Sequence, residues 1–158
     1  MATFALADIA ATERLAAALA PRLRDGDVLE LVGDLGAGKT TFVGALVGAL
    51  GSREPVRSPT YTVAHRYQLD GGRALAHLDC YRATGPLDDE AWGDLEPYFD
   101  AGIACIEWPE AIRPWLRDRP TWQLALQTVT LDARIARLTP PQQRPLDTEV
   151  DALLASWA

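Results

Sequence analysis

The segment Gly33-Asp-Leu-Gly-Ala-Gly-Lys-Thr40 constrains the fold of this chain more than any other part of the sequence. It matches G-x-x-x-x-G-K-[ST], the pattern of a P-loop, whose glycines let the backbone approach a phosphate group closely. An apolar run at 27–32 precedes it and a helical pattern from about 39 to 50 follows it, as the motif requires. The sequence therefore predicts a nucleotide-binding loop made of Gly33, Asp34, Leu35, Gly36, Ala37, Gly38, Lys39, Thr40 and Thr41.

The basic residues of the sequence point to the same loop. Of the 15 basic residues, Lys39 is the only lysine and the others are arginines. A compact ammonium fits between the β and γ phosphates, where the forked guanidinium of arginine does not. We expect Lys39 to contact the triphosphate and the Thr40 hydroxyl to bind Mg²⁺. No lysine remains for the N-K-x-D motif of GTP-specific enzymes, which favours ATP.

Two acidic residues follow apolar runs that have the pattern of buried strands. Asp79 follows the run 74–78, and Glu107 follows the run 102–106. The carboxyl ends of strands form the ligand-binding edge of open α/β sheets, and Mg²⁺ on a nucleotide needs only one or two protein carboxylates. We expect Asp79 and Glu107 to bind the metal or to orient the attacking water, as catalytic residues together with Lys39. Either acid can take either role, and each could instead cap a turn.

Length and composition indicate one soluble domain. A chain of 158 residues, 48% of them hydrophobic, can fill one substantial core. The net charge of −7 disfavours independent binding to a nucleic-acid backbone and allows an acidic face for a protein partner. Cys80 and Cys105 lie in apolar runs, which indicates buried thiols rather than a disulfide. With neither a basic leader nor an apolar run of about 20 residues, we expect a cytoplasmic protein without membrane attachment.

Alternating strand and helix patterns predict an α/β fold of the P-loop NTPase type. We expect a three-layer sandwich, with a mixed, mostly parallel sheet and helices on both faces. Residues 1–139 are predicted to form the P-loop domain, and residues 140–158 a Pro-rich linker and a C-terminal helix that docks on the domain or binds a partner. The expected strands lie at 3–7, 27–32, 63–69, 73–79, 102–107, 122–131 and 134–138, and the expected helices at 8–20, 39–50 and 88–99.

The segment Ser58-Pro-Thr-Tyr-Thr62 presents several hydroxyls without helical periodicity. We interpret Ser58, Thr60, Tyr61 and Thr62 as a switch-like loop that senses the γ-phosphate, with a rigid capped turn as the alternative. Trp108 is interpreted as a cover for the site, a partner contact or a packed aromatic residue. His65 and His77 are interpreted as packed or surface residues, because phosphoryl transfer depends on positioning and charge.

Four segments together resemble the signature blocks of the TsaE family, in the family's order and spacing. These are 33–41, 58–62, 77–82 and 106–109, so that the resemblance spans about residues 27 to 110. Cys80 stands where the family usually has a larger apolar residue, and residues 140–158 match no family block.

The resemblance implies an ATPase that joins the TsaB and TsaD proteins, which with TsaC-type enzymes place threonylcarbamoyl on adenosine 37 of tRNAs that read ANN codons. It implies that hydrolysis of Mg-ATP sustains turnover of that complex. We expect tRNA to meet this chain indirectly, through the complex. By the same resemblance, nucleotide or metal roles go to Lys39, Thr40 and Thr41, functional roles to Asp79, Glu107 and Trp108, and switch-loop roles to Thr60 and Thr62.

Two alternatives stay open at this point. The P-loop spacing also occurs in small-molecule kinases, and Arg113, Arg117 and Arg119 could form the lid of such an enzyme. A nucleotide-gated scaffold without meaningful catalysis is the other possibility.

Overall fold

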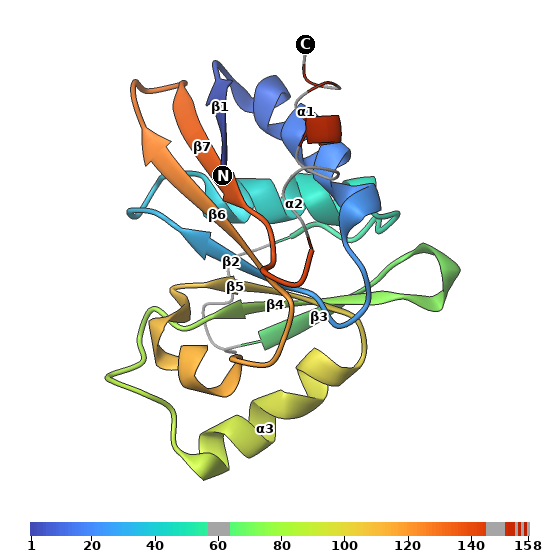
Figure 1. Ribbon diagram of the computed structural model, residues 1–158, viewed down its shortest axis with the longest axis vertical. Helices are drawn as coiled ribbons and strands as arrows, with labels where there is room; N and C mark the ends of the chain where they lie inside the picture. Colours follow the sequence, from blue (N-terminus) through green and yellow to red (C-terminus); the bar gives the residue numbers. More distant parts are fainter. Residues whose placement is uncertain (57–63, 145–150, 154, 156, 158) are drawn as a thin grey trace.

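The computed structural model describes residues 1–56, 64–144, 151–153, 155 and 157. Its centre is a seven-stranded sheet with the strand order β1-β7-β6-β2-β5-β4-β3 (Figure 1). The strands are β1 (Ala2–Leu6), β2 (Val28–Val32), β3 (Ala64–Gln68), β4 (Ala74–Asp79), β5 (Ile103–Glu107), β6 (Thr121–Thr128) and β7 (Arg134–Thr139). The helices are α1 (Ile9–Leu19), α2 (Lys39–Ala49) and α3 (Asp89–Asp100), with short 3-10 helices η1 (Ala20–Arg22), η2 (Asp70–Gly72), η3 (Pro109–Ala111) and η4 (Arg113–Trp115).

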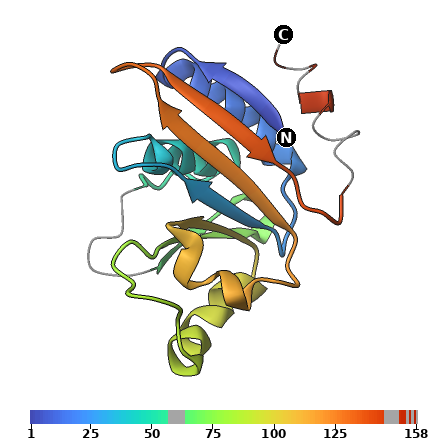
Figure 2. The same ribbon diagram turned by 60° about the vertical axis from the view of Figure 1, so that its left-hand side comes forward.

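Parallel pairing joins the four central strands, β6, β2, β5 and β4. Antiparallel pairs complete both edges: β3 pairs with β4 on one side, and β7 pairs with both β6 and β1 on the other. Figure 2 shows the β6–β7 hairpin with β1 alongside. The predicted mixed α/β sheet is confirmed. Its parallel strands lie at the centre of the sheet, where the P-loop follows the end of β2.

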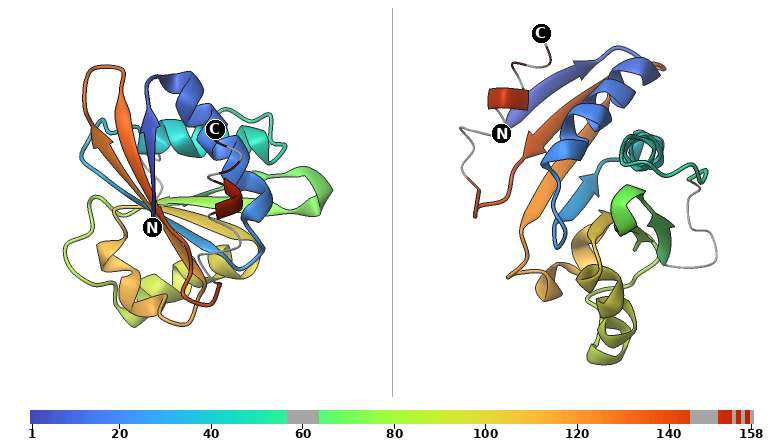
Figure 3. Two further views of the ribbon diagram at one scale, coloured as in Figure 1. Left: turned by 45° about the horizontal axis from the view of Figure 1, so that its top comes forward. Right: turned by 90° about the vertical axis from the view of Figure 1, so that its right-hand side faces the viewer.

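Helices cover both faces of the sheet, as predicted. Helices α1 and α2 pack on one face, and α3 packs on the other with the segment of η3 and η4 (Figures 1 and 3). The alternation of side chains along β2 explains the two cores: Leu29 and Leu31 face α1 and α2, whereas Val28 faces α3.

Local sequence signals set the ends of the helices. The side chain of Asp8 accepts a hydrogen bond from the backbone N–H of Ala11 at 2.9 Å and so caps α1. Asp88 caps α3 in the same way through the N–H of Ala91 at 2.8 Å. Gly51 has a φ angle of 98° directly after the end of α2, a left-handed conformation that glycine adopts without strain. The observed ends lie within about one residue of the predicted helices at 8–20, 39–50 and 88–99.

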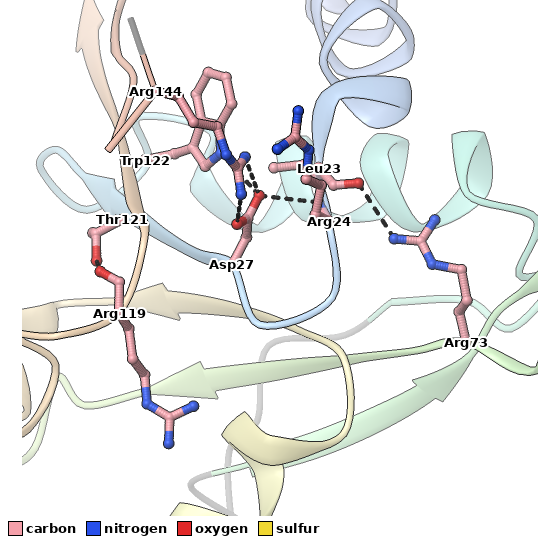
Figure 4. Close-up of polar contacts among 8 residues, drawn as sticks. All are labelled: Leu23, Arg24, Asp27, Arg73, Arg119, Thr121, Trp122 and Arg144. Carbon is pink, nitrogen blue, oxygen red and sulfur yellow. Dashed lines mark hydrogen bonds and ion pairs between the residues drawn. The ribbon is translucent and has the colours of Figure 1, made fainter. Parts of the chain in front are cut away.

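The C-terminal residues that are described contact the main body of the protein. Arg144 forms an ion pair with Asp27, which also accepts hydrogen bonds from the Trp122 indole at 3.1 Å and the Arg24 backbone N–H at 3.0 Å (Figure 4). Further along, Leu153 is fully buried in the core of the α1 and α2 face. The ring of Trp157 lies 5.1 Å from that of Phe4. These contacts agree with a C-terminal segment that docks on its own chain, one of the two expected alternatives.

Cys80 and Cys105 are free and buried, as predicted. Within the described residues, no helix combines the length and the apolar character that a membrane crossing requires.

Candidate functional site

The P-loop connects β2 to α2 at the carboxyl-terminal edge of the parallel strands. Gly33, Gly36 and Gly38 have positive φ angles of 153°, 78° and 99°. A Cβ atom on Gly33 would lie only 2.5 Å from the carbonyl oxygen of Leu126 on β6, so a side chain there would collide with the backbone of a paired strand. The first position of the loop therefore requires glycine for space as well as for conformation.

The start of α2, where the P-loop ends, leaves backbone N–H groups without partners inside the helix. The dipole of this 11-residue helix adds partial positive charge at the same end. Gly38 precedes the helix in a left-handed conformation, which helps to turn consecutive N–H groups toward one side of the loop. The arrangement is suited to holding an anion such as a phosphate group.

Lys39 lies folded over the P-loop. Its Nζ donates a hydrogen bond to the carbonyl oxygen of Gly33 at 2.5 Å and lies 3.6 Å from the centre of the Trp108 ring. Burial lowers the pKa of Lys39, although Glu107 and Asp79 favour the charged form. A carbonyl and an aromatic face are weaker partners for an ammonium than phosphate oxygens are, so Lys39 is placed to turn to an incoming phosphate.

Trp108 is the non-glycine residue with a positive φ angle in the described chain, at φ 56° and ψ 63°. Such a left-handed conformation costs a bulky residue on the order of 1 to 2 kcal/mol. It directs the indole ring from the end of β5 back over Lys39 and against Tyr81, whose ring centre lies 4.9 Å away. Of the three roles expected for Trp108, this geometry favours a cover of the site.

Glu107 ends β5 directly beside the first turn of α2. Its carboxylate oxygens Oε1 and Oε2 lie 3.3 and 3.2 Å from the Thr40 hydroxyl. Oε2 also lies 2.5 Å from Nε2 of His77, a fully buried residue on β4. Glu107 itself is buried, so that its carboxylate is held between a hydroxyl and an imidazole rather than by solvent.

Asp79 ends the neighbouring strand, β4, and is paired in register with Glu107. Its Oδ1 accepts a hydrogen bond from the backbone N–H of Tyr81 at 2.9 Å, which forms a turn after the strand. Its partial exposure contrasts with the burial of Glu107. The expectation that both acids meet at one edge of the sheet beside the P-loop agrees with the structure.

These groups surround one large cavity of about 990 Å³. The loop, Lys39, Thr40, both acids and Trp108 line it on one side. The other side is formed by the start of α1, where Ile9 lies exposed, and by the β6–β7 turn with Leu131. A cavity of this size suits a ligand as large as a nucleoside triphosphate. In the described part of the chain, no group of three or more His, Cys, Asp or Glu residues is arranged to hold a metal ion.

Arg134, at the start of β7, is a residue of this site that the sequence analysis did not identify. Its Nε donates to the carbonyl oxygen of Ala37 at 3.1 Å and its Nη2 to that of Gly36 at 3.3 Å. Its Nη1 donates to carbonyl oxygens of the β6–β7 turn, among them Leu131 at 3.1 Å. Arg134 thus links the P-loop to the β6–β7 turn, and both line the cavity. No local pattern marks this arginine among the others, since its partners in the P-loop lie almost a hundred positions away.

The interpretation of both histidines agrees with their positions, because His77 is packed and His65 lies on the surface beside Glu54. The expected switch-like loop of Ser58, Thr60, Tyr61 and Thr62 lies outside the described residues.

Comparison with known proteins gives a consistent result. The family model described as "Threonylcarbamoyl adenosine biosynthesis protein TsaE" matches residues 6–136. A TsaE protein of Aquifex aeolicus is 41% identical over 65% of this chain and 73% of its own length, and one of Bacillus subtilis is 40% identical over 66% and 65%. A TsaE protein of Mycobacterium bovis is 30% identical over 93% of this chain and 80% of its own length. Each of these relatives carries the name tRNA threonylcarbamoyladenosine biosynthesis protein TsaE.

A solved structure shares the whole fold. The crystal structure of Bacillus subtilis YdiB superimposes with a TM-score of 0.74 at 28% identity, over 98% of this chain and 95% of the other. The similarity therefore extends beyond the P-loop to the edge strands and the helices.

Proposed function

This chain belongs to the TsaE family of threonylcarbamoyl adenosine biosynthesis proteins, and we propose that it serves this tRNA modification as an ATPase that binds Mg-ATP above the P-loop. The observation that carries the proposal is the contact of the Thr40 hydroxyl with the Glu107 carboxylate, at 3.2 and 3.3 Å, at the floor of a cavity lined by the P-loop. A helix-start hydroxyl beside a strand-end carboxylate is the oxygen pair that P-loop NTPases use for a nucleotide-bound metal.

The residues present fit the triphosphate. The loop amides and the start of α2 offer donors to phosphate oxygens, and Lys39 adds a full positive charge within the loop. The Arg134 guanidinium donates hydrogen bonds to the carbonyl oxygens of Gly36 and Ala37. These acceptor atoms are therefore turned away from an anion bound by the loop. The absence of a second lysine anywhere in the sequence supports ATP over GTP, as argued above.

The residues also fit a magnesium ion that arrives with the nucleotide. Thr40, Glu107 and Asp79 offer hard oxygen atoms, which Mg²⁺ prefers, and they are too few to hold the ion without phosphate oxygens. When bound, Mg²⁺ supplies positive charge that neutralises the phosphate oxygens. We assign Glu107 to the metal shell, directly or through water, because it contacts Thr40. The more exposed Asp79 is then free to orient the attacking water.

We extend the proposal to TsaB and TsaD as partners in the cytoplasm, with tRNA reached only through their complex. Exposed apolar side chains at the cavity support a protein partner, since Leu35, Tyr81 and Leu131 are 68%, 52% and 90% exposed. The net charge of −7 makes tRNA a poor direct ligand for this chain.

Calorimetry followed by hydrolysis assays tests the proposal. We expect the purified chain to bind Mg-ATP in preference to Mg-GTP, and Lys39→Ala to lose binding. Phosphate release should be slow for the isolated chain and should rise when TsaB and TsaD are added. Glu107→Gln should keep binding of metal-free ATP, measured in EDTA, and lose the stimulated turnover. No binding of Mg-ATP, alone or with the partners, would contradict the proposal.

The two alternatives are weaker on specific grounds. A kinase lid from Arg113, Arg117 and Arg119 is poorly supported, because Arg113 is paired with Glu30 and Arg119 with Asp100, and none of the three lines the cavity. Phosphate appearing on a metabolite rather than in solution would revive this alternative. Unchanged function in Glu107→Gln would favour a nucleotide-gated scaffold.

A further inference from the structure

His77 is a fully buried polar residue beside the site, and the proposed function gives it no role. We propose that His77 is a positioning residue, which holds the Glu107 carboxylate in the orientation needed by the metal-bound nucleotide. The inference rests on the proposed function and adds to it the group that fixes Glu107.

The register of the sheet explains why these two side chains meet. His77 on β4 is paired with Cys105 on β5, so Glu107 lies diagonally two positions further along β5. Because side chains alternate along a strand, His77, Cys105 and Glu107 project from the same face of the sheet, the one covered by α1 and α2. The contact of His77 Nε2 with Glu107 Oε2 at 2.5 Å follows directly from this arrangement.

The hydrogen-bonding capacity of the imidazole fits a donor at Nε2. A carboxylate oxygen accepts hydrogen bonds, so the contact fits the tautomer of His77 that has its proton at Nε2. No described residue offers a partner to Nδ1, which is also buried. In this tautomer Nδ1 is an acceptor, so that no N–H group is buried there without a partner.

The contact from His77 differs in kind from the contact with Thr40. Thr40 lies in the first turn of α2, and its single hydroxyl proton can serve only one acceptor at a time. His77 comes from the interior of a central strand and is fixed by packing. If the Thr40 hydroxyl turns to another partner, the imidazole still holds Oε2. His77 therefore keeps Glu107 ordered independently of the P-loop helix.

Variants of His77 whose side chains differ in length and in hydrogen-bond donors provide the test. Gln can place an amide N–H close to the position of Nε2, Asn is too short to do so, and Leu removes the donor altogether. Cys105→Ala, at the paired position on β5, is the matched control for a change in the buried sheet. Dissociation constants are measured by calorimetry for ATP with Mg²⁺ and for ATP in EDTA, and thermal unfolding shows that each variant is folded.

We expect His77→Leu and His77→Asn to weaken binding of Mg-ATP by about 10- to 100-fold, the usual effect of removing a group that orients a metal ligand. Binding of metal-free ATP should stay at the wild-type value in both, and His77→Gln and Cys105→Ala should bind Mg-ATP like the wild type. If Leu fails to fold, the comparison of Asn with Gln decides.

Equal affinities of His77→Asn and His77→Gln for Mg-ATP would overturn the inference. It would also be overturned if His77→Leu and His77→Asn lost as much affinity for ATP in EDTA as for ATP with Mg²⁺. A wild-type chain that binds no Mg-ATP would overturn the proposed function, and the inference with it. The two failures are therefore distinguishable.

Discussion

The ammonium group of Lys39 lies 3.6 Å from the centre of the Trp108 indole ring. A triphosphate bound in the P-loop is a stronger partner for this cation than an aromatic face. We therefore expect nucleotide binding to draw Lys39 away from the ring and to change the fluorescence of Trp108. Titration of the chain with Mg-ATP while tryptophan emission is recorded measures this change.

The sequence contains five tryptophans, so the source of the signal must be identified. Trp108→Phe should abolish most of the change on Mg-ATP addition. Trp115→Phe is the control, because Trp115 stacks on Trp92 and its indole N–H donates to Leu87, away from the cavity. A full emission change in Trp108→Phe would show that the Lys39 contact does not report nucleotide binding.

Arg134 gives a second prediction, about the shape of the P-loop. Arg134→Ala removes the donors to the carbonyl oxygens of Gly36 and Ala37 and frees the loop from the β6–β7 turn. We expect ATP affinity, measured by calorimetry, to fall about tenfold, which corresponds to the loss of roughly one charge-assisted hydrogen bond. Arg137→Ala is the matched control on the same strand, since Arg137 contacts the Gln127 side chain instead. Equal ATP affinities of Arg134→Ala and Arg137→Ala would show that Arg134 does not hold the shape of the P-loop.

The range over which residues interact explains which parts of the site could be predicted. Lys39 and Thr40 belong to one continuous motif, and the helix start that they require lies within it. Asp79 and Glu107 were recognised because a strand end is visible in the sequence and parallel strands end at the same edge.

Three features could not be predicted because they depend on the register between distant strands. These are the contact of His77 with Glu107, the bracing by Arg134 and the part that the start of α1 plays in lining the cavity. Likewise, the strands at 3–7 and 134–138 were predicted, but nothing local shows that β7 pairs with β1 and places Leu138 opposite Ala2.

Cys80 allows a test of pH dependence. Burial, with Asp79 and Glu110 nearby, raises the pKa of the Cys80 thiol to about 11. A raised pKa means that folding favours the neutral thiol, so its contribution to stability is complete below the unfolded pKa of about 8.5 and is lost as the pH rises through about 11. Over the same interval we expect alkylation by iodoacetamide to keep accelerating, because the thiolate is the nucleophile.

The alkylation is measured in Cys105→Ala, so that Cys80 is the single thiol. The same variant unfolded in urea is the control, and its rate should level off above about pH 8.5 to 9. A folded profile that levels off at the same pH as the unfolded one would contradict the predicted pKa.

The ion pair of Arg144 with Asp27 yields a prediction about stability. Asp27 is almost completely buried at the start of β2, and Arg144 Nη1 donates to its Oδ2 at 2.7 Å (Figure 4). Arg144→Ala removes this guanidinium from the buried carboxylate, which keeps the Trp122 indole and the Arg24 N–H as donors. We expect the free energy of unfolding to fall by about 2 to 3 kcal/mol, the range for a hydrogen bond to a charged group in a buried site.

Arg73→Ala provides the comparison, because Arg73 pairs with Asp25, whose side chain is 63% exposed. An exposed pair of this kind contributes at most about 1 kcal/mol. Urea denaturation of the wild type and both variants gives the two losses. If Arg144→Ala costs no more than Arg73→Ala, the attachment of the C-terminal segment at Asp27 does not stabilise the fold. If the predicted difference is found, stability depends on residue 144, which lies beyond the part of the chain that the TsaE family model matches, residues 6–136.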